Sequence, residues 1–235
     1  MAAHLYGDRV MSAQREKHAA AEAAADLVDH GMTVGLGTGS TVAFLLPSLA
    51  RRSLDIRCVA TSPRTEHAAR ELGLSVEDFT SIEHFDIAID GADQISRNGW
   101  LVKGGGGAYT REKIVAAAAE RFVVIADSTK LVDALHGPIP LELHPYGLRA
   151  TMRRVAPVSL RNAPRSPDGG VIADYIGIFD DPATLAARFA STPGVVEHGL
   201  FPRDVVATVL VARGESVDRI DFPYVTRGRV VNERN

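Results

Sequence analysis

An ammonium group, four consecutive glycines and a carboxylate fall within one short stretch of this sequence, Lys103–Lys113. Glycine loses more conformational freedom on folding than any other residue, so four in a row favour a backbone with positive φ or one that approaches another group closely. A flexible linker is the alternative, but linkers rarely lie between an apolar strand-like run, here residues 85–89, and the start of a helix. We therefore expect a ligand to contact this loop.

Another glycine-rich run, Gly35–Thr41, comes earlier in the chain, where it follows one predicted strand and opens a predicted helix. It is called the first glycine loop here, and residues 103–107 are called the second glycine loop. Unpaired N–H groups and the positive end of the helix dipole face such a loop, and the hydroxyls of Thr38, Ser40 and Thr41 add donors for an anion. The P-loop requires Lys where this chain has Gly39. The dinucleotide fingerprint is matched only weakly, because the spacing is G-x-G-x-G and the second strand lacks a terminal acid. A simple phosphate site is predicted, with a tight structural turn as the alternative.

Two carboxylates, Asp90 and Asp93, come directly after the apolar run 85–89. Residues just past the carboxyl ends of parallel strands line the ligand crevice of an open sheet, so both acids should face the same space as the Gly35–Thr41 loop. From the residues alone, they could bind a divalent metal, form a hydrogen-bonded turn, or handle protons on substrate hydroxyls.

Composition excludes several classes of protein. The chain has 235 residues, 46% of them hydrophobic and 23% charged, and a net charge of −3, which gives no bulk attraction for nucleic acid or an anionic membrane. The single cysteine, Cys58, excludes an intramolecular disulfide, and the eight histidines show no metal-binding spacing. No secretion signal or membrane span is indicated. We expect a cytoplasmic protein without a metal, whose partner is a small molecule.

Strand-like and helix-like segments alternate along the first 130 residues, which is typical of a parallel sheet with crossover helices. Gly31 should end the first helix, and Pro47 should kink or end the second one early. Helices are expected over residues 8–30, from 40, 63–72 and 110–121, and strands over 32–36, 55–60, 85–89 and 122–126.

Beyond Lys130, prolines interrupt a β-rich stretch. An apolar strand at 204–212 is expected to return to the first sheet. The predicted fold is α/β, a Rossmann-like open parallel sheet with a smaller α+β, ferredoxin-like lid. Residues 1–133 plus about 205–235 would form the catalytic domain, and about 134–204 the lid or oligomerisation domain. Within the lid we expect helices at 146–154 and 182–190 and strands near 158, 171–176 and 195–201.

Five motifs, in order and spacing, resemble those of ribose-5-phosphate isomerase, type A. The resemblance runs from about Lys17 to Val211, and its late part includes Pro193–Val196 and Gly199–Phe201. The five motifs are Gly37-Thr38-Gly39-Ser40-Thr41, Asp90-Gly91-Ala92-Asp93, Lys103-Gly104-Gly105-Gly106, Thr110-Arg111-Glu112-Lys113 and Ile125-Ala126-Asp127-Ser128-Thr129-Lys130.

The resemblance implies reversible aldose–ketose isomerisation of ribose 5-phosphate and ribulose 5-phosphate through an enediolate, in the non-oxidative pentose phosphate pathway, without metal or organic cofactor. Glu112 matches the family's base and Lys103 its active-site lysine. Asp90 and Asp93 match paired aspartates, which we assign to furanose ring opening and hydroxyl protons. The expected substrate-binding positions are Thr38, Gly39, Ser40, Thr41, Gly104, Gly105, Gly106, Lys130 and Lys17.

The residue types suit this chemistry independently of the resemblance. One base must reach both C1 and C2, and a carboxylate such as Glu112 can do so once desolvation raises its pKa. A fixed cation such as Lys103 stabilises the charge of the enediolate more than that of the ground state.

Some positions depart from the family pattern. Gln94 stands where Glu is common, Gly107 replaces a common Ala, the turn 161–170 differs, and the tail 224–235 is longer than expected. A paralogue acting on another aldose phosphate therefore stays open. So does a non-catalytic sugar-phosphate sensing domain, although such regulators carry an N-terminal helix-turn-helix for which about thirty residues before the first strand are too few. Enzymes that this chain resembles are homodimers or homotetramers.

Overall fold

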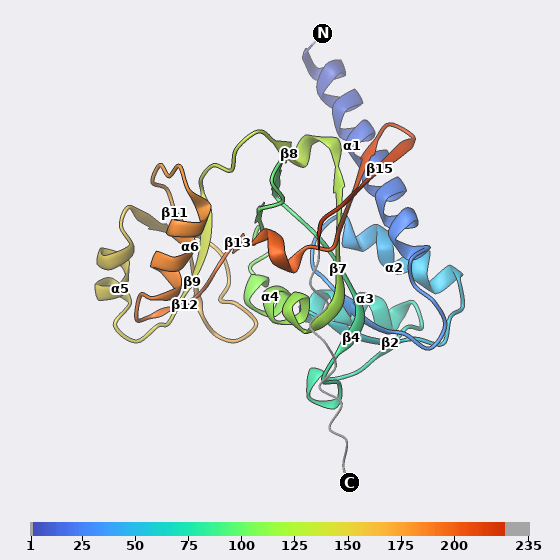
Figure 1. Ribbon diagram of the computed structural model, residues 1–235, viewed down its shortest axis with the longest axis horizontal. Helices are drawn as coiled ribbons and strands as arrows, with labels where there is room; N and C mark the ends of the chain where they lie inside the picture. The colour runs from blue at the N-terminus through green and yellow to red at the C-terminus, as the bar shows by residue number, and fades with distance from the viewer. Residues whose placement is uncertain (1, 224–235) are drawn as a thin grey trace.

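The computed structural model describes residues 2–223, and their side chains from residue 11 onward. Helices and strands alternate along most of the chain, as Figure 1 shows. The helices are α1 (Ala2–Ala25), α2 (Val42–Arg51), α3 (Pro63–Glu71), α4 (Tyr109–Ala118), α5 (Leu148–Val155) and α6 (Pro182–Ala190). The strands are β1 (Thr33–Leu36), β2 (Arg57–Ala60), β3 (Ser75–Val76), β4 (Phe85–Gly91), β5 (Gln94–Ser96), β6 (Leu101–Val102), β7 (Ala119–Asp127), β8 (Leu131–Val132), β9 (Ile139–Leu143), β10 (Val158–Leu160), β11 (Val171–Tyr175), β12 (Val195–His198), β13 (Leu200–Phe201), β14 (Thr208–Arg213) and β15 (Ser216–Asp221).

The central sheet has seven strands in the order β15-β14-β7-β4-β1-β2-β3. Every neighbouring pair is parallel except β14 with β15 at one edge. Leu36 of β1 pairs with Ile89 of β4, and Gly91 of β4 pairs with Ile125 of β7, so these strands end side by side. This order confirms the predicted open, mostly parallel sheet and the return of β14 to it.

Strand β4 shows why the sheet is buried on both faces. Ile87 and Ile89 pack with α1 and α2 in one apolar cluster, whereas Ala88 packs with Val115 of α4 in another. Successive side chains of a strand point to opposite faces, so an almost continuous apolar run fits a sheet covered by helices on both sides. Figure 1 shows α1 and α4 on opposite sides of β7.

A second unit, residues 139–198, is called the lid here. Its antiparallel sheet has the order β10-β11-β9-β12, with its own apolar core that includes Leu141 of β9 and Phe189 of α6. In Figure 1 this unit lies to the left of the central sheet. A third small sheet, β13-β6-β5-β8, joins segments from both parts of the chain. The division into domains near residues 133 and 205 stays a prediction.

Three predicted helix boundaries are wrong. Helix α1 ends at Ala25, and Gly31 instead donates its N–H to Asp55 O in the turn that leads to β1. Helix α2 continues past Pro47 to Arg51, so its early end is wrong while a kink stays a prediction, and the Ser48 hydroxyl donates to Phe44 O beside the proline. Helix α4 ends at Ala118, because Ala119 pairs with Phe85 and sheet pairing overrides the helix propensity of alanine.

The chain between 194 and 221 also differs from the prediction. The expected strand 195–201 splits into β12, which joins the lid sheet, and β13, which joins the small sheet. The edge strand β15 and strands β5, β6 and β8 were not predicted, since β15 is mostly exposed and the other three have only two or three residues each. The tail 224–235 lies outside the described residues.

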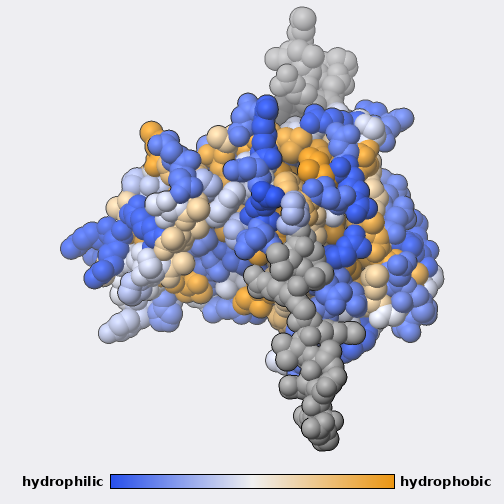
Figure 2. Space-filling model, viewed as in Figure 1, coloured by the Kyte–Doolittle hydropathy of each residue, from blue (hydrophilic) through white to orange (hydrophobic). Residues whose placement is uncertain are grey.

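The surface in Figure 2 is mainly polar, with smaller hydrophobic areas between the charged side chains. Among the helices of the described chain, none combines the length and the apolar character that a bilayer crossing requires.

Candidate active site

Three charged side chains meet in the interior where β4, β6 and α4 converge. The Lys103 ammonium lies 2.8 Å from Asp90 Oδ2 and 3.0 Å from Glu112 Oε2, and it donates to Gly91 O at 2.5 Å. Each of the three side chains is at most 4% exposed. Buried charges of this kind persist only when they are paired, so one ammonium shared by two carboxylates is a tightly coupled cluster.

Burial and charge change the protonation of these groups. Desolvation, together with the nearby Asp90 carboxylate, raises the pKa of Glu112 to about 8, although Lys103 opposes this rise. Desolvation also raises the pKa of Asp90 against the same opposing ammonium. The two carboxylates raise the pKa of Lys103 despite its burial, so it stays charged. A carboxyl with a pKa near neutrality is suited to take and return a proton.

Local sequence explains how Asp90 reaches this position. Asp90 ends β4, and its Oδ1 accepts the N–H groups of Thr38 and Gly91 at 3.0 and 2.7 Å. A Cβ on Gly37 would lie 1.9 Å from Asp90 Cγ, so only glycine fits there. The first glycine loop and the DGAD motif are therefore one packed unit.

Helix α4 carries Glu112 in its first turn and is tied to the lid by the residues around it. Thr110 donates to the buried Glu142 of β9, Arg111 pairs with Asp168, and Lys113 donates to Glu197 of β12 at 2.6 Å. These contacts leave Glu112 alone among the four to face the lysine.

The second glycine loop lies against Asp93. Gly105 N–H donates to Asp93 Oδ2 at 2.8 Å. Gly104 has φ of +119°, and a Cβ there would lie 2.6 Å from the Tyr109 ring and 2.8 Å from Pro140. Glycine is therefore required at this position by conformation and by space.

The predicted phosphate positions gather at the ends of β1 and β7. The Lys17 ammonium donates to Ser40 Oγ at 3.0 Å and lies 3.9 Å from Asp127. Thr38 Oγ1 lies 2.8 Å from Thr61 Oγ1, so this hydroxyl is held by the protein. Ser40 is exposed, Lys130 is half-buried and Thr41 is buried.

A cavity of about 270 Å³ joins these groups. Eleven of the thirteen predicted residues line it, while Asp90 lies behind Lys103, and Lys17 contacts the lining through Ser40. Gly91 and Ala92 also line the cavity and were not predicted, although their place between the two aspartates was a signal. The predicted residues of the lining are Thr38, Gly39, Ser40, Thr41, Asp93, Lys103, Gly104, Gly105, Gly106, Glu112 and Lys130.

Phe201 is a further neighbour that sequence reasoning did not single out. Its ring lies 5.4 Å from Lys103 Nζ and 4.9 Å from Lys113 Nζ. Gln94, one of the departures noted above, does not line the cavity: it exchanges two hydrogen bonds with the backbone of His136.

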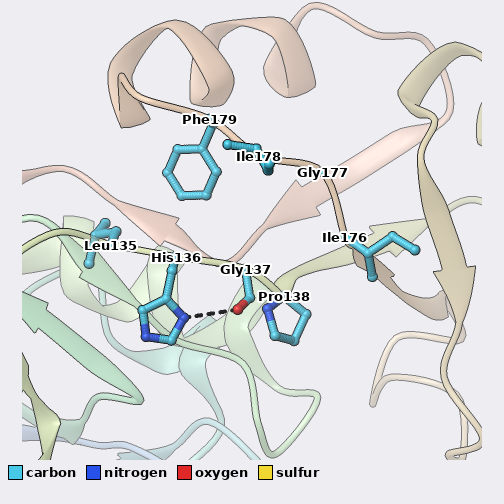
Figure 3. Close-up of a pocket in the computed structure, with 8 residues that line it drawn as sticks. All are labelled: Leu135, His136, Gly137, Pro138, Ile176, Gly177, Ile178 and Phe179. Carbon is cyan, nitrogen blue, oxygen red and sulfur yellow. Dashed lines mark hydrogen bonds between the residues drawn. The ribbon is translucent and has the colours of Figure 1, made fainter.

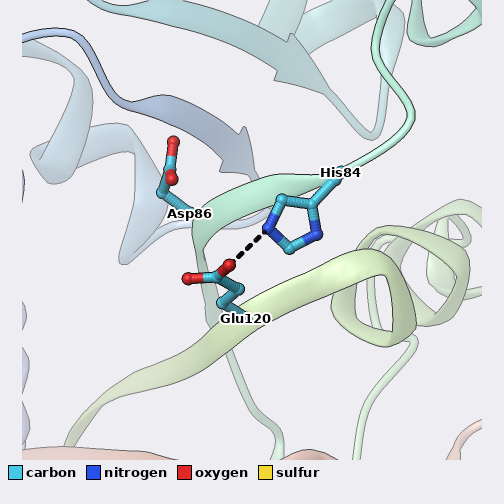
Figure 4. Close-up of side chains that lie close together, drawn as sticks. All are labelled: His84, Asp86 and Glu120. Carbon is cyan, nitrogen blue, oxygen red and sulfur yellow. Dashed lines mark ion pairs between the residues drawn. The ribbon is translucent and has the colours of Figure 1, made fainter. Parts of the chain in front are cut away.

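Two other features lie away from this cavity. Within the described residues, His84, Asp86 and Glu120 form a group whose possible metal-ligand atoms lie within 4.8 Å of one another. This group lies at the N-terminal ends of β4 and β7, away from the cavity (Figure 4). Its members have protein partners, because His84 lies 3.0 Å from Glu120 and Asp86 accepts from Thr33.

A cavity of about 410 Å³ at the lid edge is lined mainly by apolar residues, from Leu135 to Pro138 and from Ile176 to Phe179 (Figure 3).

Comparison with known proteins gives consistent matches. A family model described as ribose 5-phosphate isomerase A (phosphoriboisomerase A) matches residues 57–216. A ribose-5-phosphate isomerase A from a Caulobacter species is 46% identical over 206 residues, which cover 81% of this chain and 91% of that relative. The crystal structure of ribose 5 phosphate isomerase A from Neisseria gonorrhoeae aligns with a TM-score of 0.85 and 32% identity, over 89% of this chain and 98% of that one. A D-ribose-5-phosphate isomerase in complex with phospho-erythronic acid aligns with a TM-score of 0.84 and 32% identity, over 89% and 99%.

Proposed function

Because this chain belongs to the ribose 5-phosphate isomerase A family, we propose that it interconverts ribose 5-phosphate and ribulose 5-phosphate. The observation that carries the proposal is the Glu112 carboxyl, which lines the cavity beside Lys103 with a pKa raised to about 8. Residues 38–41 of the first glycine loop line the same cavity, so a base and a proposed anion site lie within reach of one small substrate.

Glu112 is the proposed base. It takes the proton from C2 of the open-chain aldehyde, and the electron pair moves into the bond between C1 and C2 to give an enediolate. The same carboxyl then returns the proton to C1, while the O2 proton moves to O1 and C2 becomes the ketone. No atom is gained or lost, and a base with a pKa near 8 performs both transfers at neutral pH.

Lys103 stabilises the enediolate oxygens in this proposal, because a fixed ammonium in a site that excludes water stabilises a developing negative charge more strongly than solvent water does. Asp90, behind Lys103, is a positioning residue that holds the ammonium. Asp93 lines the cavity and keeps one carboxylate oxygen for the Gly105 N–H, so its other oxygen is available for ring opening and hydroxyl protons. This assignment gives the two aspartates different roles, positioning for Asp90 and proton handling for Asp93.

The phosphate group is proposed to bind at Gly39, Ser40, Thr41 and Lys130, with Lys17 acting through Ser40. The sensing-domain alternative is not favoured, since the curated relatives are named isomerases and this chain has a carboxyl, Glu112, that lines the cavity. Another aldose phosphate as the substrate is also not favoured by these names.

The deciding experiment is a coupled assay for ketose formation from ribose 5-phosphate, with arabinose 5-phosphate and unphosphorylated ribose as comparison substrates. Turnover of ribose 5-phosphate alone, unchanged after exhaustive chelation, is expected. Phospho-erythronic acid, whose carboxylate resembles the planar enediolate, should inhibit competitively. Absence of turnover, or faster turnover of arabinose 5-phosphate, would reject the proposed function, and restoration by Mg²⁺ after chelation would reject the role of Lys103.

We also infer a homodimer or homotetramer in the cytoplasm. Ile176 and Ile178, beside the cavity in Figure 3, are 59% and 95% exposed, and exposed apolar patches often mark protein interfaces. Light scattering measures the mass of the oligomer, and Ile178→Asp should reduce that mass if this edge is an interface.

Cell fractionation tests the proposed cytoplasmic location.

A further inference from the structure

The polar turn 161–170, one of the departures noted in the sequence, joins β10 to β11 within the lid and contacts the catalytic part of the chain. Arg161 follows β10 directly, and its N–H donates to Ile172 O on β11. Arg161 Nε and Nη2 bind both carboxylate oxygens of Asp174, Nε at 2.9 Å, so the guanidinium is fixed in the plane of that carboxylate. A bidentate pair of this kind sets orientation as well as distance.

The remaining nitrogen of Arg161 points to the second glycine loop. Nη1 donates to Gly104 O at 2.8 Å and reaches Gly105 O at 3.4 Å. Gly105 and Gly106 are exposed, and a run of four glycines is costly to order. The contacts of the fixed Arg161 guanidinium with two carbonyls of the loop offset part of this entropic cost.

The loop in turn fixes groups that face the cavity. Lys103 precedes Gly104 directly, and the Gly105 N–H binds Asp93 Oδ2 at 2.8 Å. A continuous path therefore runs from Asp174 on the lid through Arg161 and the loop backbone to Asp93. Arg161 itself does not line the 270 Å³ cavity.

We propose that Arg161 is a positioning residue for the isomerisation, which holds the Gly104–Gly106 loop from the lid and thereby sets the Asp93 carboxylate against the substrate. The proposal rests on the proposed function. It explains why a lid residue 57 positions along the chain from Gly104 carries a half-buried ion pair next to that loop.

The test compares Arg161→Gln with a matched control, Arg165→Gln. Arg165 lies in the same turn, but its Nη1 donates only to Gly169 O within the turn. Arg161→Gln should lower kcat about 10–100-fold with KM changed less than about threefold, because a misplaced catalytic group costs rate more than phosphate binding. Arg165→Gln should keep kcat within about twofold of the parent enzyme, since its hydrogen bond stays within the turn and does not reach the loop. Arg165 also lines a neighbouring cavity of about 740 Å³ with Ser40, so any change should fall on KM.

Two further measurements separate positioning from general destabilisation. Arg161→Gln should add little to the loss caused by Asp93→Asn, because both act on one carboxylate and such effects are not additive. Amide hydrogen exchange over residues 104–107 should accelerate in Arg161→Gln and not in Arg165→Gln. This measurement does not depend on turnover, so the inference and the proposed function can fail separately.

If Arg161→Gln does not fold, Arg161→Lys decides the matter, since lysine can still donate to Gly104 O but cannot also bind Asp174 in a bidentate manner. An intermediate kcat with faster loop exchange supports the proposal. A parent-like kcat in a folded Arg161 variant, unchanged exchange of the loop, or full additivity with Asp93→Asn would overturn it.

Discussion

The two halves of the candidate site are built in opposite ways. Asp90, Lys103 and Glu112 are almost completely buried and satisfy one another's charges. The half proposed to bind phosphate, around Ser40 and Lys130, is more open, and Ser40 lies in a loop at a helix start. Proton transfer needs a raised pKa, which only desolvation and neighbouring charge supply, whereas phosphate recognition needs donors that a hydrated anion can reach.

This contrast teaches that substitutions in the two halves should separate kinetically. A buried group that interacts more strongly with the enediolate than with the substrate affects kcat. A group that holds phosphate equally in both states affects KM.

Glu112→Gln should give the largest effect. The amide keeps the shape of the side chain but cannot accept the C2 proton, so kcat should fall about 10²–10⁴-fold with little change in KM. Steady-state kinetics of ketose formation measures both constants. Near-normal turnover in a folded variant would remove Glu112 from the mechanism and contradict the proposed difference between the two halves of the site.

Lys103→Ala should follow, with kcat lower by about 10²–10³-fold and a smaller change in KM, because the charge on the enediolate loses its fixed cation. Lys113→Ala is the matched control: it removes another ammonium near Phe201, a half-buried one that pairs with Glu197 and does not line the cavity. Equal loss of kcat in the two variants, at matched thermal stability, would mean that Lys103 acts only on the fold.

Lys130→Ala and Thr41→Ala should raise KM about 10–100-fold and change kcat much less, because phosphate contacts persist from the ground state to the transition state. Binding of inorganic phosphate, measured by calorimetry, should weaken in parallel. An unchanged KM in both variants would locate the phosphate group elsewhere.

The pH dependence of kcat/KM also tests the difference between the two halves of the site, and it gives the smallest of the expected effects. Glu112 must be ionised to accept a proton, and its pKa in the folded protein is raised to about 8. The value of kcat/KM should therefore rise about tenfold per pH unit below 8 and level off above it. The substrate phosphate titrates near pH 6, about two units lower, so a rise confined to that region would contradict the assignment.

Much of the fold follows from local pattern. The alternation of helices and strands, and the apolar run of β4, predict the parallel sheet before any contact is known. Helix α4 marks the limit: alanine favours a helix beyond residue 118, but Ala119 pairs with Phe85 and begins a strand. The edge strand β15 has a mostly exposed pattern that gives little periodic signal.

The candidate site was predictable as a set of residues but not as an arrangement. Its motifs contain glycines, hydroxyls and charges at spacings that indicate phosphate and proton chemistry. They do not reveal that Asp90 lies behind Lys103 while Asp93 faces the cavity. Arg161 was noted only as the first residue of an unmatched turn, since its contact with Gly104 joins residues far apart in the chain.

The sequence by itself determined the types of reactive groups and the places where the backbone requires glycine, because both are properties of a residue and its near neighbours. Tertiary structure alone decided which carboxyl is buried, which one meets the cavity and how far the pKa of Glu112 rises. Desolvation and Coulomb interactions depend on distances between segments that only packing brings together.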